Sequence, residues 1–248
     1  RHGTRGSAAA HGVAGVAAAH YLATAKGAKV ILADQRPPLS HTSALSTECY
    51  RAYWANSKPM TAMMHRSIDL LEERARECDN AFHMSRRGYW FVTATEQGAK
   101  HQRKMAQEVG LLGYGDARVY DHGDHSVRYT ADTSYDAVTD ALTVFQGPAA
   151  INAFTANLPR FLTAEATSLM HVGRAGWMSA QQMGEHLLHR ARAAGAETLT
   201  PASLVAVHAP DGAIGGATLI GARGEEIEVR CGAIVNCAGP YAASVDLL

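Results

Sequence analysis

The sequence lacks several features that would place it in familiar classes of proteins. Its 248 residues carry no net formal charge, with 23 Lys and Arg against 23 Asp and Glu. A chain without excess positive charge is not expected to bind nucleic acid or an anionic membrane surface. No apolar run approaches the roughly twenty residues of a membrane-spanning helix, and the N-terminus does not resemble a signal peptide. We therefore expect a soluble, cytoplasmic protein whose partner is a small molecule.

Cysteine is scarce, and its spacing predicts neither cross-links nor a metal site. The four cysteines are scattered and form no CxxC pair: Cys49, Cys78, Cys231 and Cys237. A disulfide framework or a structural zinc site needs denser or paired cysteines. Residues 121–125 (DHGDH) have metal-ligand side chains, but no helix would place the two histidines beside a third ligand. We expect a solvated loop there and no metal.

What the sequence does contain is a nucleotide-binding pattern near its start. Gly12 and Gly15 occupy the second and third glycine positions of a GxGxxG fingerprint, where the backbone passes close to a pyrophosphate and a helix packs close to its strand. A helix of small and apolar residues over 16–25 and an apolar strand over 29–33 follow. Asp34 ends that strand, at the position where a carboxylate can accept hydrogen bonds from ribose hydroxyls.

The beginning of this pattern is incomplete. Ala10 stands in place of the first glycine, and residues 1–9 contain no run of Val, Ile or Leu typical of a central parallel strand. The residues alone therefore leave two alternatives open, a nucleotide site or a purely structural βαβ unit. Without a first strand, we expect weak or absent affinity for a dinucleotide.

The rest of the chain alternates between recognisable helices and strands. Residues 35–51 contain two prolines and many hydroxyls, which predict a loop whose hydroxyls either bind phosphate at the head of a helix or cap that helix. Helices are predicted over 61–78, 96–109 and 180–194, the last with a capping box of Ser179 and Gln182, and a further one begins near Tyr241. Strands are predicted over 89–93, 203–208, 214–220, 226–230 and 232–236.

Taken in this order, the segments resemble the FAD-dependent oxidoreductases of the D-amino-acid oxidase superfamily, especially its glycine oxidase, sarcosine oxidase and dimethylglycine dehydrogenase branch. The resemblance covers about residues 12–248. Three motifs carry most of it: Thr42-Ser43 with Ser46-Thr47-Glu48-Cys49-Tyr50-Arg51, then Gly176-Trp177-Met178-Ser179-Ala180-Gln181-Gln182, then Ile234-Val235-Asn236-Cys237-Ala238-Gly239-Pro240.

The resemblance implies an α/β fold in which an FAD-binding Rossmann-like domain, made of a βαβ parallel sheet and a β-meander, carries an inserted α+β substrate subdomain. We expect the FAD-binding domain to comprise residues 1–82 and 165–248 and the substrate subdomain to comprise residues 83–164. The strand ending at Asp34 and the strand at 234–236 should then share one sheet. The chain starts without Met and stops inside a predicted helix, so we expect a fragment of a longer protein.

The resemblance also implies a cofactor, FAD, and the residues that hold it. Gly12 and Gly15 match the pyrophosphate approach, and Asp34 matches the ribose acid, for which the family usually has Glu. The remaining cofactor-binding positions line the path toward the flavin, meet the adenine, or turn under the phosphates: Thr42, Ser43, Thr47, Leu204, Ala238 and Gly239.

The implied reaction oxidises the C–N bond of an amino acid or of a secondary or tertiary amine by hydride transfer to the flavin, with oxygen or another electron acceptor. No catalytic side chain stands out, because the cofactor performs the chemistry. Arg51 could hold a substrate carboxylate or could lie on a helix surface. Two alternatives remain, an NAD(P)-dependent Rossmann dehydrogenase and a truncated, non-catalytic remnant that no longer binds FAD.

Overall fold

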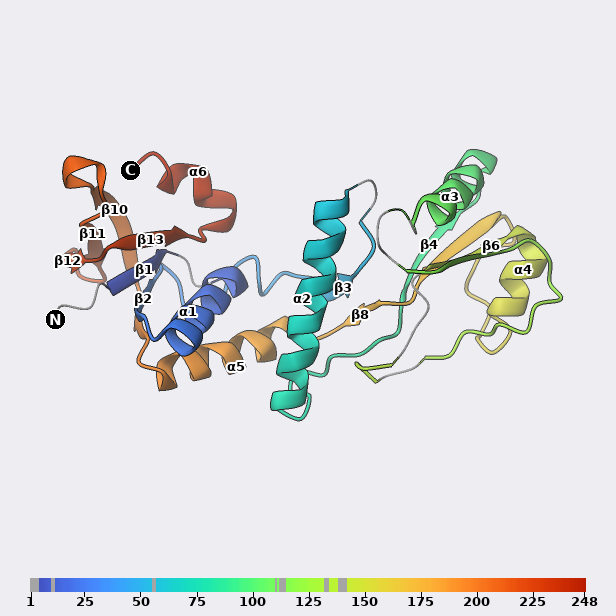
Figure 1. Cartoon of the computed structure of the whole chain (residues 1–248), viewed down its shortest axis with the longest axis horizontal. Coiled ribbons are helices and arrows are strands. Elements are labelled where there is room, and N and C mark those ends of the chain that lie inside the picture. Colours follow the sequence, from blue (N-terminus) through green and yellow to red (C-terminus); the bar gives the residue numbers. More distant parts are fainter. Residues whose placement is uncertain are drawn as a thin grey trace. The chain divides into compact units, whose positions relative to one another are not determined.

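The computed structural model describes residues 5–9 (backbone only), 12–54, 57–109, 111, 115–131, 134–137 and 142–248. The chain divides into two compact units (Figure 1). Unit 1 comprises Arg1–Thr47 and Ala180–Leu248, and unit 2 comprises Glu48–Ser179. Residues 48–82 and 165–179, which the sequence analysis assigned to the FAD-binding domain, therefore belong to unit 2 by their contacts.

Unit 1 is built on a four-stranded parallel sheet. Its strand order is β13 (Ala233–Asn236), β1 (Arg5–Ala9), β2 (Lys29–Ala33) and β9 (Glu197–Leu199). The strand before Asp34 and the strand at 233–236 thus share one sheet, as the sequence predicted. Sequence patterns had not indicated β9.

The prediction that the first strand is missing is wrong. β1 pairs with β2 on one side, from Arg5 opposite Lys29 to Ala9 opposite Ala33, and with β13 on the other side. Backbone groups make these ladders, so a central strand does not require β-branched side chains when its neighbours supply the apolar cover. Ala10, where the fingerprint lacks its first glycine, lies outside the described residues.

Helices and a second sheet cover the two faces of the parallel sheet (Figure 1). α1 (Val13–Lys26) and α5 (Ala180–Ala193) pack side by side, and α1 also contacts β2. On the other face, Ile31 and Ala33 of β2 pack against Leu219 and Val229 of the meander. The meander consists of β10 (Ala202–His208), β11 (Gly216–Gly221) and β12 (Glu226–Arg230), antiparallel throughout.

Short turns complete unit 1 at the positions where the sequence has turn residues. The 3₁₀ helix η2 (Pro210–Gly212) joins β10 to β11, and Asp211 and Gly212 both adopt positive φ there. Asp and Gly tolerate this conformation better than other residues, which is why the pair predicted a turn. After β13, η3 (Gly239–Tyr241) leads into α6 (Ala242–Val245), a helix of one turn.

Unit 2 contains a mixed four-stranded sheet in the order β4 (Tyr89–Thr93), β7 (Ser168–Val172), β6 (Leu142–Gln146) and β5 (Ala117–Tyr120). α3 (Glu96–Val109) and α4 (Gly147–Phe154) pack on it. An aromatic and aliphatic core forms under α4, where Phe145 and Phe154 stack at 4.1 Å between ring centres. β4 and α3 have the limits expected from the sequence, whereas β5, β6, α4 and β7 had not been predicted.

The remainder of unit 2 consists of α2 (Lys58–Glu77) and a two-stranded antiparallel ribbon. The ribbon pairs β3 (Cys49–Arg51) with β8 (Ala175–Trp177). The predicted loop over 35–51 is therefore correct only as far as Glu48, because its last three residues form β3. Residues 49–51 form a strand because they pair with β8, and no local sequence pattern predicts that pairing.

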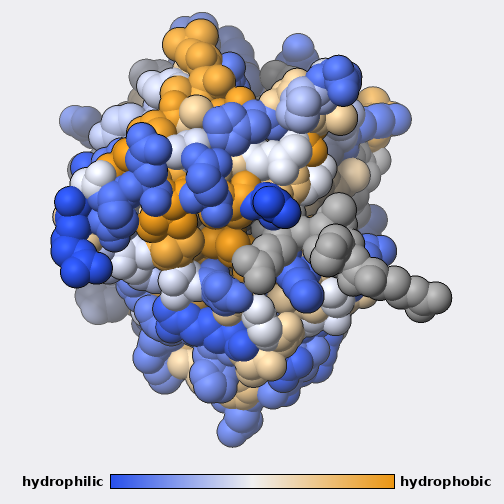
Figure 2. Space-filling view, turned by 90° about the vertical axis from the view of Figure 1, so that its left-hand side faces the viewer, coloured by the Kyte–Doolittle hydropathy of each residue, from blue (hydrophilic) through white to orange (hydrophobic). Residues whose placement is uncertain are grey.

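The face of unit 1 shown in Figure 2 carries apolar side chains gathered among hydrophilic ones. Val205 of β10 and Val235 of β13 are among the exposed large apolar side chains of this unit. In the part of the chain that the structure describes, no helix is both long enough and apolar enough to cross a membrane.

Candidate functional site

A cavity of unit 1 opens at the carboxyl ends of its parallel strands. Its volume is about 490 Å³. Asp34 follows β2 directly, Cys237 follows β13 directly, and Gly12 begins α1 shortly after β1, and all three line the cavity. Crevices outside the carboxyl ends of parallel strands are where open α/β sheets bind their ligands. Three segments that are far apart in the sequence thus meet in one place.

The first wall of the cavity is the N-terminus of α1. Gly12 has φ −66° and ψ 168° and begins the helix without a capping side chain of its own. The backbone N–H of Val13 instead donates to the hydroxyl Oγ of Ser43, 3.0 Å away. Unpaired N–H groups and the helix dipole at such an end favour an anionic ligand. The hydroxyl-rich loop therefore lies at the head of α1, which precedes it, and not at the head of a helix that follows it.

The second wall holds the predicted ribose acid. The Oδ1 atom of Asp34 accepts a hydrogen bond from the backbone N–H of Arg36 at 2.9 Å, which orients the carboxylate. The backbone of Asp34 bridges two other segments, donating to Leu199 at 3.1 Å and accepting from Ala202 at 2.7 Å. This links the end of β2 to the start of the meander, so that Leu204 also lines the cavity.

The third wall is the turn after β13. The N–H of Ala238 donates to the side-chain oxygen of Asn236 at 3.1 Å, and Gly239 adopts a positive φ of 56°. Ala238 and Gly239 both line the cavity, as does Cys237. Burial raises the pKa of the Cys237 thiol, so this side chain stays neutral and contributes an apolar surface.

The structure gathers seven of the nine predicted cofactor-binding residues around the cavity, and Arg51 does not line it. The seven are Gly12, Asp34, Thr42, Ser43, Leu204, Ala238 and Gly239. Gly15 is buried inside α1, where it can serve close packing. Thr47 is exposed at the end of the first segment of unit 1 and does not line the cavity.

Arg51 lies in unit 2, on β3, among aromatic rings. Its guanidinium carbon is 4.4 Å from the ring centre of Trp54 and 5.3 Å from that of Tyr89. Its Nε atom is buried and has no hydrogen-bond partner among the described residues. The alternative that Arg51 lies on a helix surface is excluded, because β3 is a strand. Aromatic faces stabilise the cation, while its edge keeps its capacity to donate hydrogen bonds.

Sequence reasoning missed several side chains of the cavity. Arg36, His41 and Tyr241 line it, and the rings of His41 and Tyr241 lie 5.9 Å apart, from the loop and from η3. Arg36 could have been found, since it stands two residues after the predicted acid. Tyr241 could not, because its proximity to His41 depends on the tertiary structure.

A parallel sheet covered by helices on one face and a β-meander on the other, with its cavity at the strand ends, defines a Rossmann-like nucleotide-binding fold. A sequence profile of the family described as FAD dependent oxidoreductase, DAO, matches residues 11–248. The chain belongs to this family of FAD-dependent oxidoreductases, which confirms the resemblance found in the sequence.

Solved structures have the same fold. Glycine oxidase from Bacillus cereus ATCC 14579 is similar with a TM-score of 0.73 and 14% sequence identity, over 97% of this chain and 56% of that one. L-proline dehydrogenase from P. horikoshii gives a TM-score of 0.75 at 16% identity, over 98% of this chain and 55% of that one. L-amino acid deaminase from Proteus vulgaris gives a TM-score of 0.71 at 13% sequence identity, over 96% of this chain and 48% of that one.

The chain thus spans about half the length of these structural relatives. A search among curated proteins found no match. Since the sequence identities are low, the structural similarity establishes the fold and the α/β architecture expected from the sequence, and the activity is argued below from the site.

Proposed function

We propose that unit 1 binds FAD in the cavity at its strand ends, and that the protein oxidises the C–N bond of an amino acid or of a secondary or tertiary amine. The observation that carries this proposal is the meeting of Gly12, Asp34 and Ala238 around one cavity. Each of them matches a cofactor-binding position of the family, and each comes from a different stretch of the chain. Family membership favours FAD over NAD(P).

The residues present fit the adenosine diphosphate part of this cofactor. Asp34 would accept hydrogen bonds from ribose hydroxyls, and the head of α1 with Thr42 and Ser43 would face the pyrophosphate. The backbone around Leu204 would meet the adenine. Gly239 would let the chain turn under the phosphates, because its positive φ suits glycine. The presence of β1 removes the reason for expecting weak affinity and weakens the alternative of a non-binding remnant.

Bound FAD would supply the acceptor for a hydride that leaves the carbon beside the substrate nitrogen, after which water hydrolyses the imine product. The side chains of this chain would bind and orient. We propose that unit 1 serves the cofactor and that unit 2, with the expected subdomain 83–164 at its centre, serves the substrate. Arg51 is the candidate partner for a substrate carboxylate, because its guanidinium is held between rings and its Nε has no acceptor among the described residues.

The test is to purify the protein and record its visible absorbance spectrum, then to titrate FAD against the cofactor-free form by fluorescence quenching. Reduction should be followed anaerobically with glycine, sarcosine, L-proline and a panel of D- and L-amino acids. Consumption of oxygen, compared with reduction of a dye, identifies the electron acceptor. We expect saturable FAD binding and bleaching by at least one amine.

Two outcomes would contradict the proposal. Tight binding of NADP⁺ in the absence of FAD binding would favour the dehydrogenase alternative. A well-folded protein that binds neither cofactor would favour the remnant alternative.

A further inference from the structure

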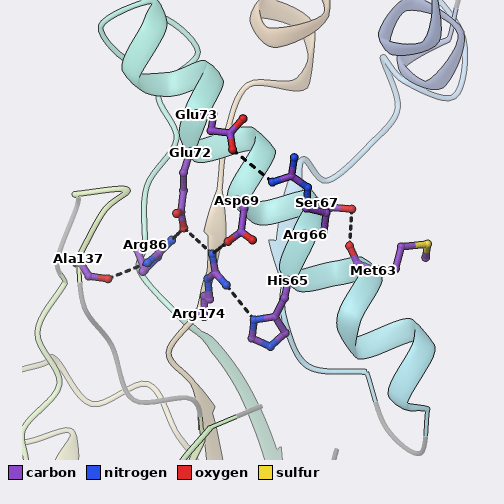
Figure 3. Close-up of polar contacts among 10 residues, drawn as sticks. All are labelled: Met63, His65, Arg66, Ser67, Asp69, Glu72, Glu73, Arg86, Ala137 and Arg174. Atoms are coloured by element: carbon purple, nitrogen blue, oxygen red, sulfur yellow. Dashed lines mark hydrogen bonds and ion pairs between the residues drawn. The ribbon is translucent and has the colours of Figure 1, made fainter. Parts of the chain in front are cut away.

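A network of four charged side chains joins α2 to the ribbon that carries Arg51 (Figure 3). The guanidinium of Arg174, which directly precedes β8, donates to Asp69 at 2.6 Å and to Glu72 at 3.1 Å, both on α2. Arg86 donates to the same oxygen of Glu72, and also to the backbone carbonyl of Ala137 at 2.8 Å. Glu72 is therefore shared by two arginines that come from different segments.

The Arg86–Glu72 pair at the centre of the network is largely removed from water, whereas the side chain of Asp69 is 45% exposed. The side chain of Arg86 is 6% exposed and that of Glu72 is 15% exposed. Burial by itself lowers the pKa of Arg174, but the hydrogen bonds that it donates to Asp69 and Glu72 raise the pKa above its ordinary value. Removing one member of a buried ion pair leaves the charge of the other member buried and unpaired. Loss of the Glu72 carboxylate would therefore deprive both arginines of the negative charge that they share.

Arg174, and Ser85 next to Arg86, hold the two residues that flank Arg51. The backbone N–H of Ala52 donates to the carbonyl of Arg174 at 2.9 Å. The hydroxyl of Tyr50 donates to the carbonyl of Ser85, the neighbour of Arg86, at 2.8 Å. Glu72 is thus connected to Ala52 through Arg174, and to Tyr50 through Arg86 and its neighbour Ser85.

The ribbon is short, and residues 85–88 pair with its β8 edge. Ser85 forms a bridge with Trp177, and the N–H of Gly88 donates to the carbonyl of Ala175 at 2.9 Å. β3 and β8 have three residues each and form a sheet with no third strand in the described structure. Isolated two-stranded ribbons are marginally stable, so the position of Arg51 depends on what packs beside them. The packing of Arg51 against Trp54 and Tyr89 requires the backbone of β3 to stay in register with β8.

We infer that Glu72 is a positioning residue, which sets the orientation of Arg51 for binding a carboxylate by tying Arg86 and Arg174 together. This inference rests on the proposed role of Arg51 as the partner of a substrate carboxylate. Glu72 does not touch the ligand itself. Its effect on binding passes through the backbone of β3.

Benzoate, an aromatic monocarboxylate, is the probe that tests the inference, with benzyl alcohol as its uncharged counterpart. Binding is measured by calorimetry and by tryptophan fluorescence, and the thermal unfolding of each variant is recorded separately. We expect Glu72→Gln to weaken benzoate binding by about tenfold, the scale of coupling within one charge network. Binding of benzyl alcohol should stay unchanged.

The matched control is Glu73→Gln, the next residue on α2, whose carboxylate is 39% exposed and pairs with Arg66 at 3.3 Å. We expect it to bind benzoate as the unmodified protein does. Asp69→Asn, at a 45% exposed position, is the milder second variant in case Glu72→Gln does not fold. It should weaken benzoate binding by a smaller factor and leave the protein folded.

The variant Arg51→Met distinguishes the proposed role of Arg51 from the positioning role of Glu72. If Arg51→Met abolishes benzoate binding while folded Glu72→Gln and Asp69→Asn bind as the unmodified protein does, the positioning role of Glu72 is wrong and the role of Arg51 stands. If Arg51→Met itself binds benzoate normally, or if the unmodified protein does not bind it, the role of Arg51 is wrong and the inference falls with it.

Discussion

The backbone amide of Val13 donates to the hydroxyl of Ser43 across 3.0 Å, joining the first turn of α1 to a loop thirty residues further along. This bond brings the glycine turn and the hydroxyl-rich loop, which the sequence shows as separate motifs, to the same wall of one cavity. It also satisfies one of the N–H groups that a helix leaves unpaired at its start.

The variant Gly12→Ala distinguishes the effect of this glycine on FAD binding from its effect on the stability of the fold. A Cβ atom at this position would lie 3.6 Å from the Oγ of Ser43, an ordinary contact, and a φ of −66° suits alanine. We expect the free energy of unfolding to change by less than about 1 kcal/mol, the scale of a cap substitution. FAD affinity should fall at least tenfold, because the methyl group would occupy the proposed path of the pyrophosphate. Urea denaturation and FAD titration measure the two effects, and unchanged affinity would contradict the proposed approach at Gly12.

Asp34→Ala should weaken FAD binding by about 1–3 kcal/mol, the scale for losing a charged hydrogen-bond acceptor. Asp34→Asn should weaken FAD binding by only part of that amount, because the amide oxygen still accepts a hydrogen bond. Fluorescence titration of the cofactor-free protein gives the dissociation constants, and Asp116→Asn, an exposed position in unit 2, is the control. Equal affinities for all four proteins would mean that Asp34 only ends a strand.

His65 should make the stability of the protein fall in mild acid. Burial lowers the pKa of this histidine and Arg174 lowers it further, because Nδ1 lies 2.9 Å from the Arg174 guanidinium and has to accept a hydrogen bond (Figure 3). The unfolded chain then takes up the proton more readily than the folded one, so stability is present above a pH of about 6.5 and is lost as the pH falls below it.

The variant His65→Asn removes the imidazole that takes up this proton and keeps a hydrogen-bond acceptor near the position of Nδ1. We expect the free energy of unfolding of this variant to depend less on pH between about 7 and 5 than that of the unmodified protein. The difference in slope should stay below about 1.4 kcal/mol per pH unit, the limit for one proton, because the side chain is only partly buried. His122→Asn, at an exposed position, should keep the original slope.

Gly176→Ala should destabilise unit 2. A Cβ atom on this residue of β8 would lie 1.8 Å from the backbone oxygen of Ser85, and a backbone atom cannot move aside as a flexible side chain can. We expect a loss of about 3 kcal/mol, at the upper end of overpacking effects. Urea denaturation measures it, and Gly12→Ala serves as the glycine-to-alanine control without a clash. Unfolding at the original midpoint would show that the ribbon moves away from Ser85 at little cost.

Local sequence patterns predicted those elements that have strong periodicity or turn residues. The apolar run before Asp34 predicted β2, and the Asp211-Gly212 pair predicted the turn of the meander. The helical spacing of four apolar residues predicted α2: Met64, Ile68, Leu71 and Ala75. The same patterns failed for β1, whose Gly, Ser and Ala residues have low strand propensity, and for β3, which exists through its pairing with β8.

The sequence by itself determined the family and the α/β class, and it supplied the candidate residues of a nucleotide site, because glycine turns, strand-end acids and capped helices depend on neighbouring residues. Only the tertiary structure decided which of those residues meet. It placed Gly12, Asp34 and Gly239 around one cavity, and Arg51 between aromatic rings on a ribbon. It also joined Glu72 to two arginines from distant segments. Contacts between distant segments form when strands pair and faces pack, and the chain carries no local signal for them.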